Sequence, residues 1–176
     1  MIGAALALAV VSRPVQTSAR QNKNPDLARE IRHQLGQLPF YSAFDFITFT
    51  LDGKHVTLTG QVVRPSLRKH AEEVIKSLEG VETVNDQIEV LPKSERDDEL
   101  RRAIYRAIYE DPVLEGYAVQ AVPSIHIIVK DGSVTLEGTV ISAADKSLAA
   151  KRAGTVENIV GVKNNLKLPA GRSAAE

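Results

Sequence analysis

Residues 56–62 of the chain read VTLTGQV, and residues 134–140, shifted by 78 positions, read VTLEGTV. The same offset aligns two further apolar segments of the 176-residue chain: residues 47–51 with 125–129, and residues 78–90 with 156–168. The period is longer than that of solenoid repeats, which need neighbouring repeats to bury a core. Each copy is long enough to form a small domain with a thin core. The repeat therefore predicts two similar domains and not one array.

The hydrophobic pattern predicts the same order of elements in both copies. Apolar residues at i, i+4 and i+8 predict a first helix in each: Leu27, Ile31 and Leu35, then Leu100, Ile104 and Ile108. Two alternating strands follow, joined by Asp-Gly at residues 52–53 and 131–132, which is a strong hairpin signal. A second helix and a final strand complete each copy. The predicted fold class is therefore α+β, with two tandem αββαβ modules, each a three-stranded sheet with two helices packed on one face.

Glycine or asparagine occupies six positions that are predicted to serve backbone geometry: Gly53, Gly60, Gly80, Gly132, Gly138 and Asn158. The glycines at positions 60 and 138 fall in mid-strand, where glycine indicates a bulge or a close approach of backbone. Positions 80 and 158 are equivalent and follow the second helix, and both residue types tolerate the left-handed conformation that closes a helix. We therefore expect these six residues to shape the chain and not to contact a ligand.

The domain boundaries follow from the repeat. The first module is expected to span residues 24–92 and the second residues 94–169, with residues 170–176 as a flexible tail. The linker around Lys93 is too short for free tumbling, so the modules should touch. Residues 1–19 contain an uncharged apolar run that is too short to span a bilayer. They resemble a secretory signal that lacks its basic start, and the alternative is a disordered or core-packed tail.

Composition excludes several kinds of chemistry. The chain is 43% hydrophobic and 25% charged, which is ordinary for a globular protein. Its formal net charge of +0 provides no global field that would favour nucleic acid or an anionic membrane, so any electrostatic site must be local. The absence of cysteine excludes disulfides, thiolate chemistry and cysteine-based zinc sites.

No catalytic constellation is present in the sequence. The four histidines are His33, His55, His70 and His126. None of them is spaced from another as metal ligands are. A structural role is expected for His126, which alternates with the core-facing Ile125 and Ile127. There is no nucleophile elbow, P-loop or dinucleotide fingerprint. We therefore expect no enzymatic activity, no cofactor, no metal site, no small-molecule substrate and no nucleic-acid partner.

The ordered set of motifs, occurring twice, resembles the BON-domain family. The likeness rests on residues 52–62 and 80–88 in the first copy and on residues 131–140 and 158–166 in the second. Asn158 replaces the first copy's glycine and is a mild departure. The resemblance implies a non-enzymatic periplasmic module, linked to envelope stress, that binds anionic phospholipid surfaces or envelope proteins. A cytoplasmic location follows instead if the N-terminal segment is not a signal.

The first helix of the second copy is the candidate lipid-binding element. Wound at 100° per residue, its polar side is predicted to carry three arginines and two tyrosines: Arg101, Arg102, Tyr105, Arg106 and Tyr109. Tyrosine rings suit the headgroup depth of a membrane, and guanidinium groups suit phosphate. The alternative for the two tyrosines is packing against the first module.

A second candidate surface precedes the first strand, at Phe40, Tyr41, Phe44 and Phe46. The rings at positions 44 and 46 are predicted to point away from the core face of that strand. They are therefore expected on the open side of the sheet, where they can bury against either the second module or a partner protein. The alternative to a phospholipid-binding module is therefore a protein–protein scaffold that uses this surface.

Overall fold

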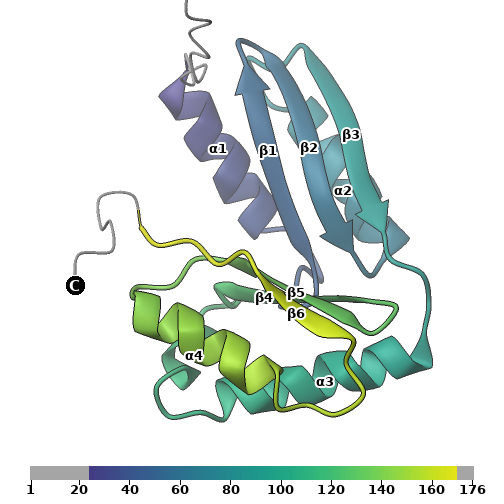
Figure 1. Ribbon diagram of the computed structural model, residues 1–176. Coiled ribbons are helices and arrows are strands. Elements are labelled where there is room, and N and C mark those ends of the chain that lie inside the picture. The colour runs from purple at the N-terminus through teal and green to yellow at the C-terminus, as the bar shows by residue number, and fades with distance from the viewer. Residues whose placement is uncertain (1–23, 170–176) are drawn as a thin grey trace, which may run out of the picture.

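The computed structural model describes residues 24–169 (Figure 1). Module one contains α1 (Pro25–Gly36), β1 (Phe46–Asp52), β2 (His55–Val62), α2 (Pro65–Lys76) and β3 (Thr83–Val90). Module two contains α3 (Glu95–Tyr109), a short 3-10 helix η1 (Glu115–Ala118), β4 (Ile125–Lys130), β5 (Ser133–Gly138), α4 (Ala143–Ala153) and β6 (Gly161–Asn164). The predicted signal segment and C-terminal tail lie outside the described residues.

Both modules have the predicted αββαβ order, so the α+β fold class is confirmed. The sheets have the strand orders β1-β2-β3 and β4-β5-β6. In each sheet the first two strands form an antiparallel hairpin, and the third pairs in parallel with the second. The helix between the second and third strands makes the crossover that a parallel pair requires.

Each module has its own core between its sheet and its two helices (Figure 1). The core of module one includes Ile31 from α1, Leu58 from β2 and Ile75 from α2, all fully buried. In module two, α3 and α4 lie together beneath the sheet, and Ile104 occupies the position that Ile31 has in module one. Two residues of module one reach the core of module two, because Ala43 is buried in it and Phe44 packs against it. The cores are therefore nearly but not wholly separate.

Three of the described α-helices begin with a side-chain cap. The Asn24 side chain accepts a hydrogen bond from Leu27 N (3.1 Å), and Ser94 Oγ accepts one from Asp97 N (3.2 Å). Ser142 begins α4 in the same way. Such caps satisfy backbone donors that have no partner inside the helix. The start of α2 differs, because its N-cap residue, Arg64, makes no side-chain hydrogen bond to the first turn of the helix.

The two hairpins turn at equivalent positions but with different residues. In module one the turn residues are Gly53 and Lys54, and the glycine has φ of 64°. In module two they are Asp131 and Gly132, with φ of 51° and 75°. The turn of module one needs the left-handed conformation at only one of its two central residues, whereas the turn of module two needs it at both. This difference accounts for the displacement of Asp-Gly by one residue between the copies.

Candidate functional site

The structure corrects the predicted orientation of Arg101 on α3. The side chain is buried, with 2% of the residue exposed. Its guanidinium donates to the carboxylate of Asp98 and, through Nη2, to the carbonyl oxygen of Val129 (2.6 Å). At 100° per residue, position 101 lies only about 20° from Ile108 on the buried stripe. Arg101 therefore borders the core and does not belong to the solvent face.

Tyr109 was also predicted to face outward and is buried, with 7% exposed. Its hydroxyl donates a hydrogen bond to the carbonyl oxygen of Ile125 (2.5 Å). Tyr105 is half-buried, and its ring packs edge-on against Phe44 of module one at a centroid distance of 5.9 Å. Tyr105 therefore packs against module one, which was the alternative to a membrane-facing position.

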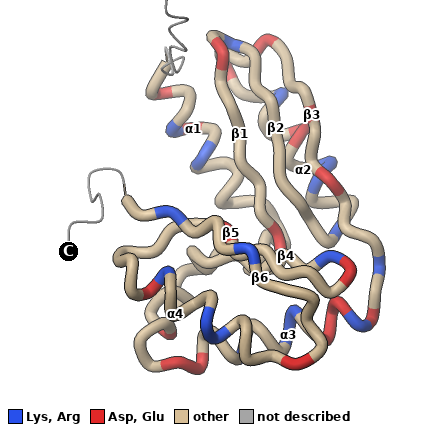
Figure 2. Tube along the Cα trace, in the orientation of Figure 1, with Lys and Arg blue, Asp and Glu red and all other residues tan. Residues whose placement is uncertain are grey.

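Arg102 and Arg106 are the two members of the predicted lipid face that remain exposed on α3. Within residues 24–169 neither forms an ion pair. Figure 2 shows that basic and acidic residues alternate over both modules, without one large face of a single sign. These two arginines are therefore a local positive feature on a mixed surface.

The aromatic segment before β1 lies mostly at the contact between the modules. The rings of Tyr41 and Phe46 lie 5.6 and 5.4 Å from that of His126 on β4. Between them along the chain, the carbonyl oxygen of Ala43 accepts a hydrogen bond from Ile127 N (2.6 Å). This bond occupies part of the free edge of β4, which would otherwise present unpaired backbone groups.

Phe40 is the exception in this segment. Its ring is 71% exposed and lies 5.2 Å from the guanidinium carbon of Arg64. Of the four aromatic residues predicted as an interaction surface, Phe40 is the most exposed, and the other three are half-buried. The module contact uses the rings of Tyr41, Phe44 and Phe46.

His126 is a buried titratable group at the module contact, with 7% of the residue exposed. Burial lowers its pKa below the ordinary value, opposed by the nearby backbone carbonyls of Asp45 and Ser42. Its Nδ1 has no hydrogen-bond partner among the described residues. The ring fills the space between Tyr41 and Phe46 and acts in packing.

Within residues 24–169, one ion pair also joins the modules. Lys130 Nζ lies 2.6 Å from Glu89 Oε1, and both side chains are about half exposed. The hydrogen bond from Lys130 lowers the pKa of the Glu89 carboxyl. An exposed pair of this kind contributes little to stability, so the aromatic contacts carry most of the junction.

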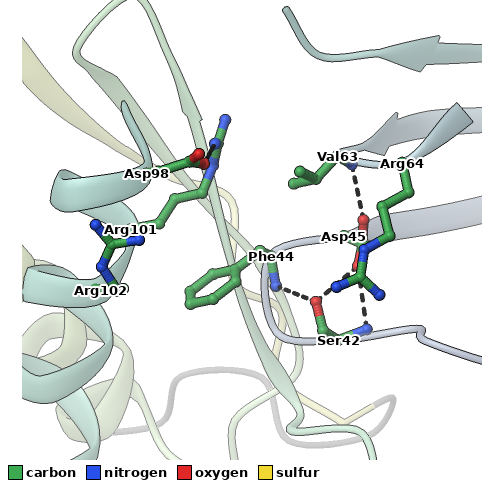
Figure 3. A pocket seen from close by; sticks show the side chains of 8 residues that line it. All are labelled: Ser42, Phe44, Asp45, Val63, Arg64, Asp98, Arg101 and Arg102. Carbon is green, nitrogen blue, oxygen red and sulfur yellow. Dashed lines mark hydrogen bonds and ion pairs between the residues drawn. The ribbon is translucent and has the colours of Figure 1, made fainter. Parts of the chain in front are cut away.

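A cavity of about 290 Å³ lies at the same junction, between the end of β2 and the first turns of α3 (Figure 3). It is lined by eight residues: Ser42, Phe44, Asp45, Val63, Arg64, Asp98, Arg101 and Arg102. Three are arginines and two are aspartates. The site is therefore polar and charged, and it exists only because both modules contribute a wall.

Residues 24–169 contain no group of three or more metal-ligating side chains. None of the helices described is long and apolar enough to cross a membrane.

Comparison with known proteins identifies the family. The sequence model of the BON domain matches the chain twice, over residues 24–92 and 96–170. The chain belongs to the BON domain family. Its two BON domains coincide closely with the two modules described above.

One curated relative of this BON domain protein is the osmotically-inducible protein Y of Escherichia coli K12. The two are 33% identical over 130 residues, which is 69% of this chain and 61% of the relative. The match therefore spans about three fifths of the relative's length.

Two solved structures of CdsD, a structural protein of the type III secretion system of Chlamydia trachomatis, are also similar. The first is the structure of the C-terminal domain of CdsD, which is 15% identical to this chain with a TM-score of 0.34. The alignment covers 82% of this chain and 98% of the CdsD chain. The other is 14% identical with a TM-score of 0.30, covering 81% and 92%. At these scores no inference is drawn from the likeness.

Proposed function

We propose that this BON domain protein is a non-enzymatic module of the bacterial cell envelope that associates with anionic phospholipid surfaces. The observation that carries the proposal is the exposed pair Arg102 and Arg106 on α3. They stand at i and i+4, where like charges repel and destabilise a helix by a few tenths of a kcal/mol. A negatively charged surface would relieve this repulsion and gain about 1 kcal/mol for each arginine.

The cellular setting is part of the same proposal. A periplasmic location and a role in envelope maintenance or stress are supported by membership of the BON family and by the osmotically inducible relative. The export-like character of residues 1–19 supports it as well. Tyr105 and Tyr109 are not included in the membrane-facing surface, because Tyr109 is buried and the half-buried ring of Tyr105 packs against Phe44.

The test is flotation with vesicles of phosphatidylglycerol and, separately, of phosphatidylcholine. The double variant Arg102→Gln/Arg106→Gln should bind phosphatidylglycerol vesicles more weakly by up to about 2 kcal/mol, and the loss should shrink at high salt. The matched control is Lys151→Gln/Lys163→Gln, which removes the same charge from exposed positions outside α3. If the control loses as much binding, net charge and not the α3 surface is responsible.

A protein–protein scaffold remains the alternative, on a different surface from the aromatic segment. Val113, Val119 and Ile141 are 61%, 84% and 62% exposed. Val113 and Ile141 line a hollow of about 470 Å³ beside Tyr117. Exposed apolar groups around a hollow are typical of a protein contact. Flotation only in the presence of a partner protein, never with vesicles alone, would favour this alternative.

A further inference from the structure

We propose that the cavity between the two BON domains is a binding site for a phosphate group, held between Arg64 of module one and Arg102 of α3. The cavity of about 290 Å³ is at the small end of the range for ligand sites, which suits a phosphate ester. The ester can belong to a lipid headgroup or to a soluble molecule. In the first case the inference rests on the proposed function, and in the second it is independent of it.

The two aspartates that line the cavity already have partners. The carboxylate of Asp45 is buried and accepts hydrogen bonds from Ser42 N (3.1 Å), Ser42 Oγ (2.7 Å) and Val63 N (2.8 Å). The carboxylate of Asp98 pairs with Arg101. Neither aspartate pairs with Arg64 or Arg102 in the described residues. The guanidinium donors of those two arginines are therefore not used by the aspartates, and the charged side chains that line the cavity, three arginines and two aspartates, leave a formal excess of one positive charge.

Arg64 and Arg102 approach from opposite walls. In Figure 3, Arg64 lies with Ser42 and Asp45 of module one, and Arg102 lies on α3 across the cavity. Arg64 stands at the start of α2, where it makes no capping bond, and it packs over Phe40. Packing over a ring orients a guanidinium but leaves free the N–H donors, which lie in the plane of the guanidinium itself. Two such forks can share the oxygens of one phosphate.

Arg101 adds a buried charge to the same cavity. Two of its guanidinium nitrogens have partners, but Nε is buried without one. A buried donor without a partner costs free energy, and an anion nearby would offset part of that cost through its charge. The cavity thus has three guanidinium groups, against two carboxylates that are already hydrogen-bonded.

The experiment titrates the full chain with inorganic phosphate and with glycerol 3-phosphate, followed by calorimetry and by amide NMR shifts around Ser66. Saturable binding is expected for wild type. Arg64→Gln and Arg102→Gln should each weaken it roughly tenfold, because each removes a charge-assisted hydrogen-bonding group. Lys151→Gln is the control, because it removes the same charge from an exposed position outside the cavity lining, and it should bind as wild type does. Unchanged melting curves would show that all three variants are folded.

The same variants are then floated with phosphatidylglycerol vesicles. A lipid source is supported if Arg64→Gln weakens flotation and glycerol 3-phosphate competes with the vesicles. Binding of the soluble probes without any flotation supports the site and rejects the proposed membrane function. Absence of saturable phosphate binding, or an equal loss of phosphate binding in Lys151→Gln, overturns the site. Flotation that then depends on Arg102 and Arg106 but not on Arg64 leaves the membrane proposal intact.

Discussion

Gly60 and Gly138 lie at equivalent positions of β2 and β5, with φ of 129° and 111°. A Cβ atom at these positions would lie 2.0 Å from the carbonyl oxygen of Phe46 and 2.1 Å from that of Ser124. These distances are far below van der Waals contact, and the neighbouring atom is backbone that cannot swing away. The two glycines therefore allow the hairpin strands to approach each other, as expected for glycine in a strand.

Substitution of Gly60 by valine should lower the free energy of unfolding by roughly 1–3 kcal/mol, through clash and strain at a positive φ. Urea denaturation measures the change. Gly36→Ala is a control, because a Cβ there meets nothing within 4 Å. Vesicle binding per folded molecule should be unchanged in Gly60→Val. A stable variant that fails to bind would mean that the glycine contacts a ligand.

At the scale of elements, α3 is buried over a wider arc than α1. It packs on β4, on α4 and on η1, and its Tyr105 also meets Phe44 of module one. Arg101 and Tyr109 fall within this arc and satisfy the carbonyl oxygens of Val129 and Ile125. The exposed side of the helix is therefore narrower than its amphipathic pattern indicates.

Substitution of Tyr109 by phenylalanine should lower the free energy of unfolding by about 1 kcal/mol, because the carbonyl oxygen of Ile125 loses its buried donor. Arg106→Gln on the exposed side should change stability by no more than about 0.5 kcal/mol. Thermal melts of both variants test the assignment. Equal stability of Tyr109→Phe and wild type, together with weaker vesicle binding, would place that hydroxyl outside the protein.

For the whole molecule, the junction between the modules covers one side of β4. Tyr41 and Phe46 enclose His126, and Ala43 enters the core of module two. The remaining core of module two comes from its own residues. The second module should therefore fold alone but with less stability than in the full chain.

A fragment of residues 94–176 should show a cooperative melt. Its free energy of unfolding should be roughly 1–3 kcal/mol lower than that of module two in the full chain, the amount associated with uncovering one or two buried side chains. Urea denaturation of both proteins, followed by an NMR signal of β5, measures the difference. A fragment without a cooperative transition would show that the two modules depend on one shared core.

The junction should also respond to pH. The pKa of His126 is lowered in the folded state by burial, so the unfolded chain binds a proton more readily. Stability from this group is then fully present above the ordinary histidine pKa of about 6.5 and is lost as pH falls towards the lower folded value. The slope in that window is at most about 1.4 kcal/mol per pH unit.

Denaturation of wild type and of His126→Gln between pH 7.5 and pH 5 tests this expectation. The wild type should lose more stability than the variant over the window. His70→Gln is the control, because His70 is exposed on α2 and should keep the wild-type slope. Identical slopes for wild type and His126→Gln would show that the histidine is protonated equally in both states.

The sequence by itself determined the features that depend on neighbours along the chain. The repeat, the helix caps at Asn24 and Ser94, and the left-handed residues Gly80 and Asn158 all follow from local chemistry. Hydrophobic alternation placed Ile47 and Leu51 on the core face of β1, where they are buried. Such features form because backbone groups and side chains within a few residues satisfy one another.

Tertiary structure alone decided which polar side chains are buried and which groups they contact. Asp97 accepts hydrogen bonds from Asp131 N and Gly132 N (both 2.9 Å), across 34 and 35 residues of chain. The cavity between Arg64 and Arg102 likewise needs the end of β2 to meet α3, and no local pattern encodes that contact. Burial of an arginine or a tyrosine depends on a partner carbonyl brought near by folding, so periodicity by itself assigned Arg101 and Tyr109 to the wrong side.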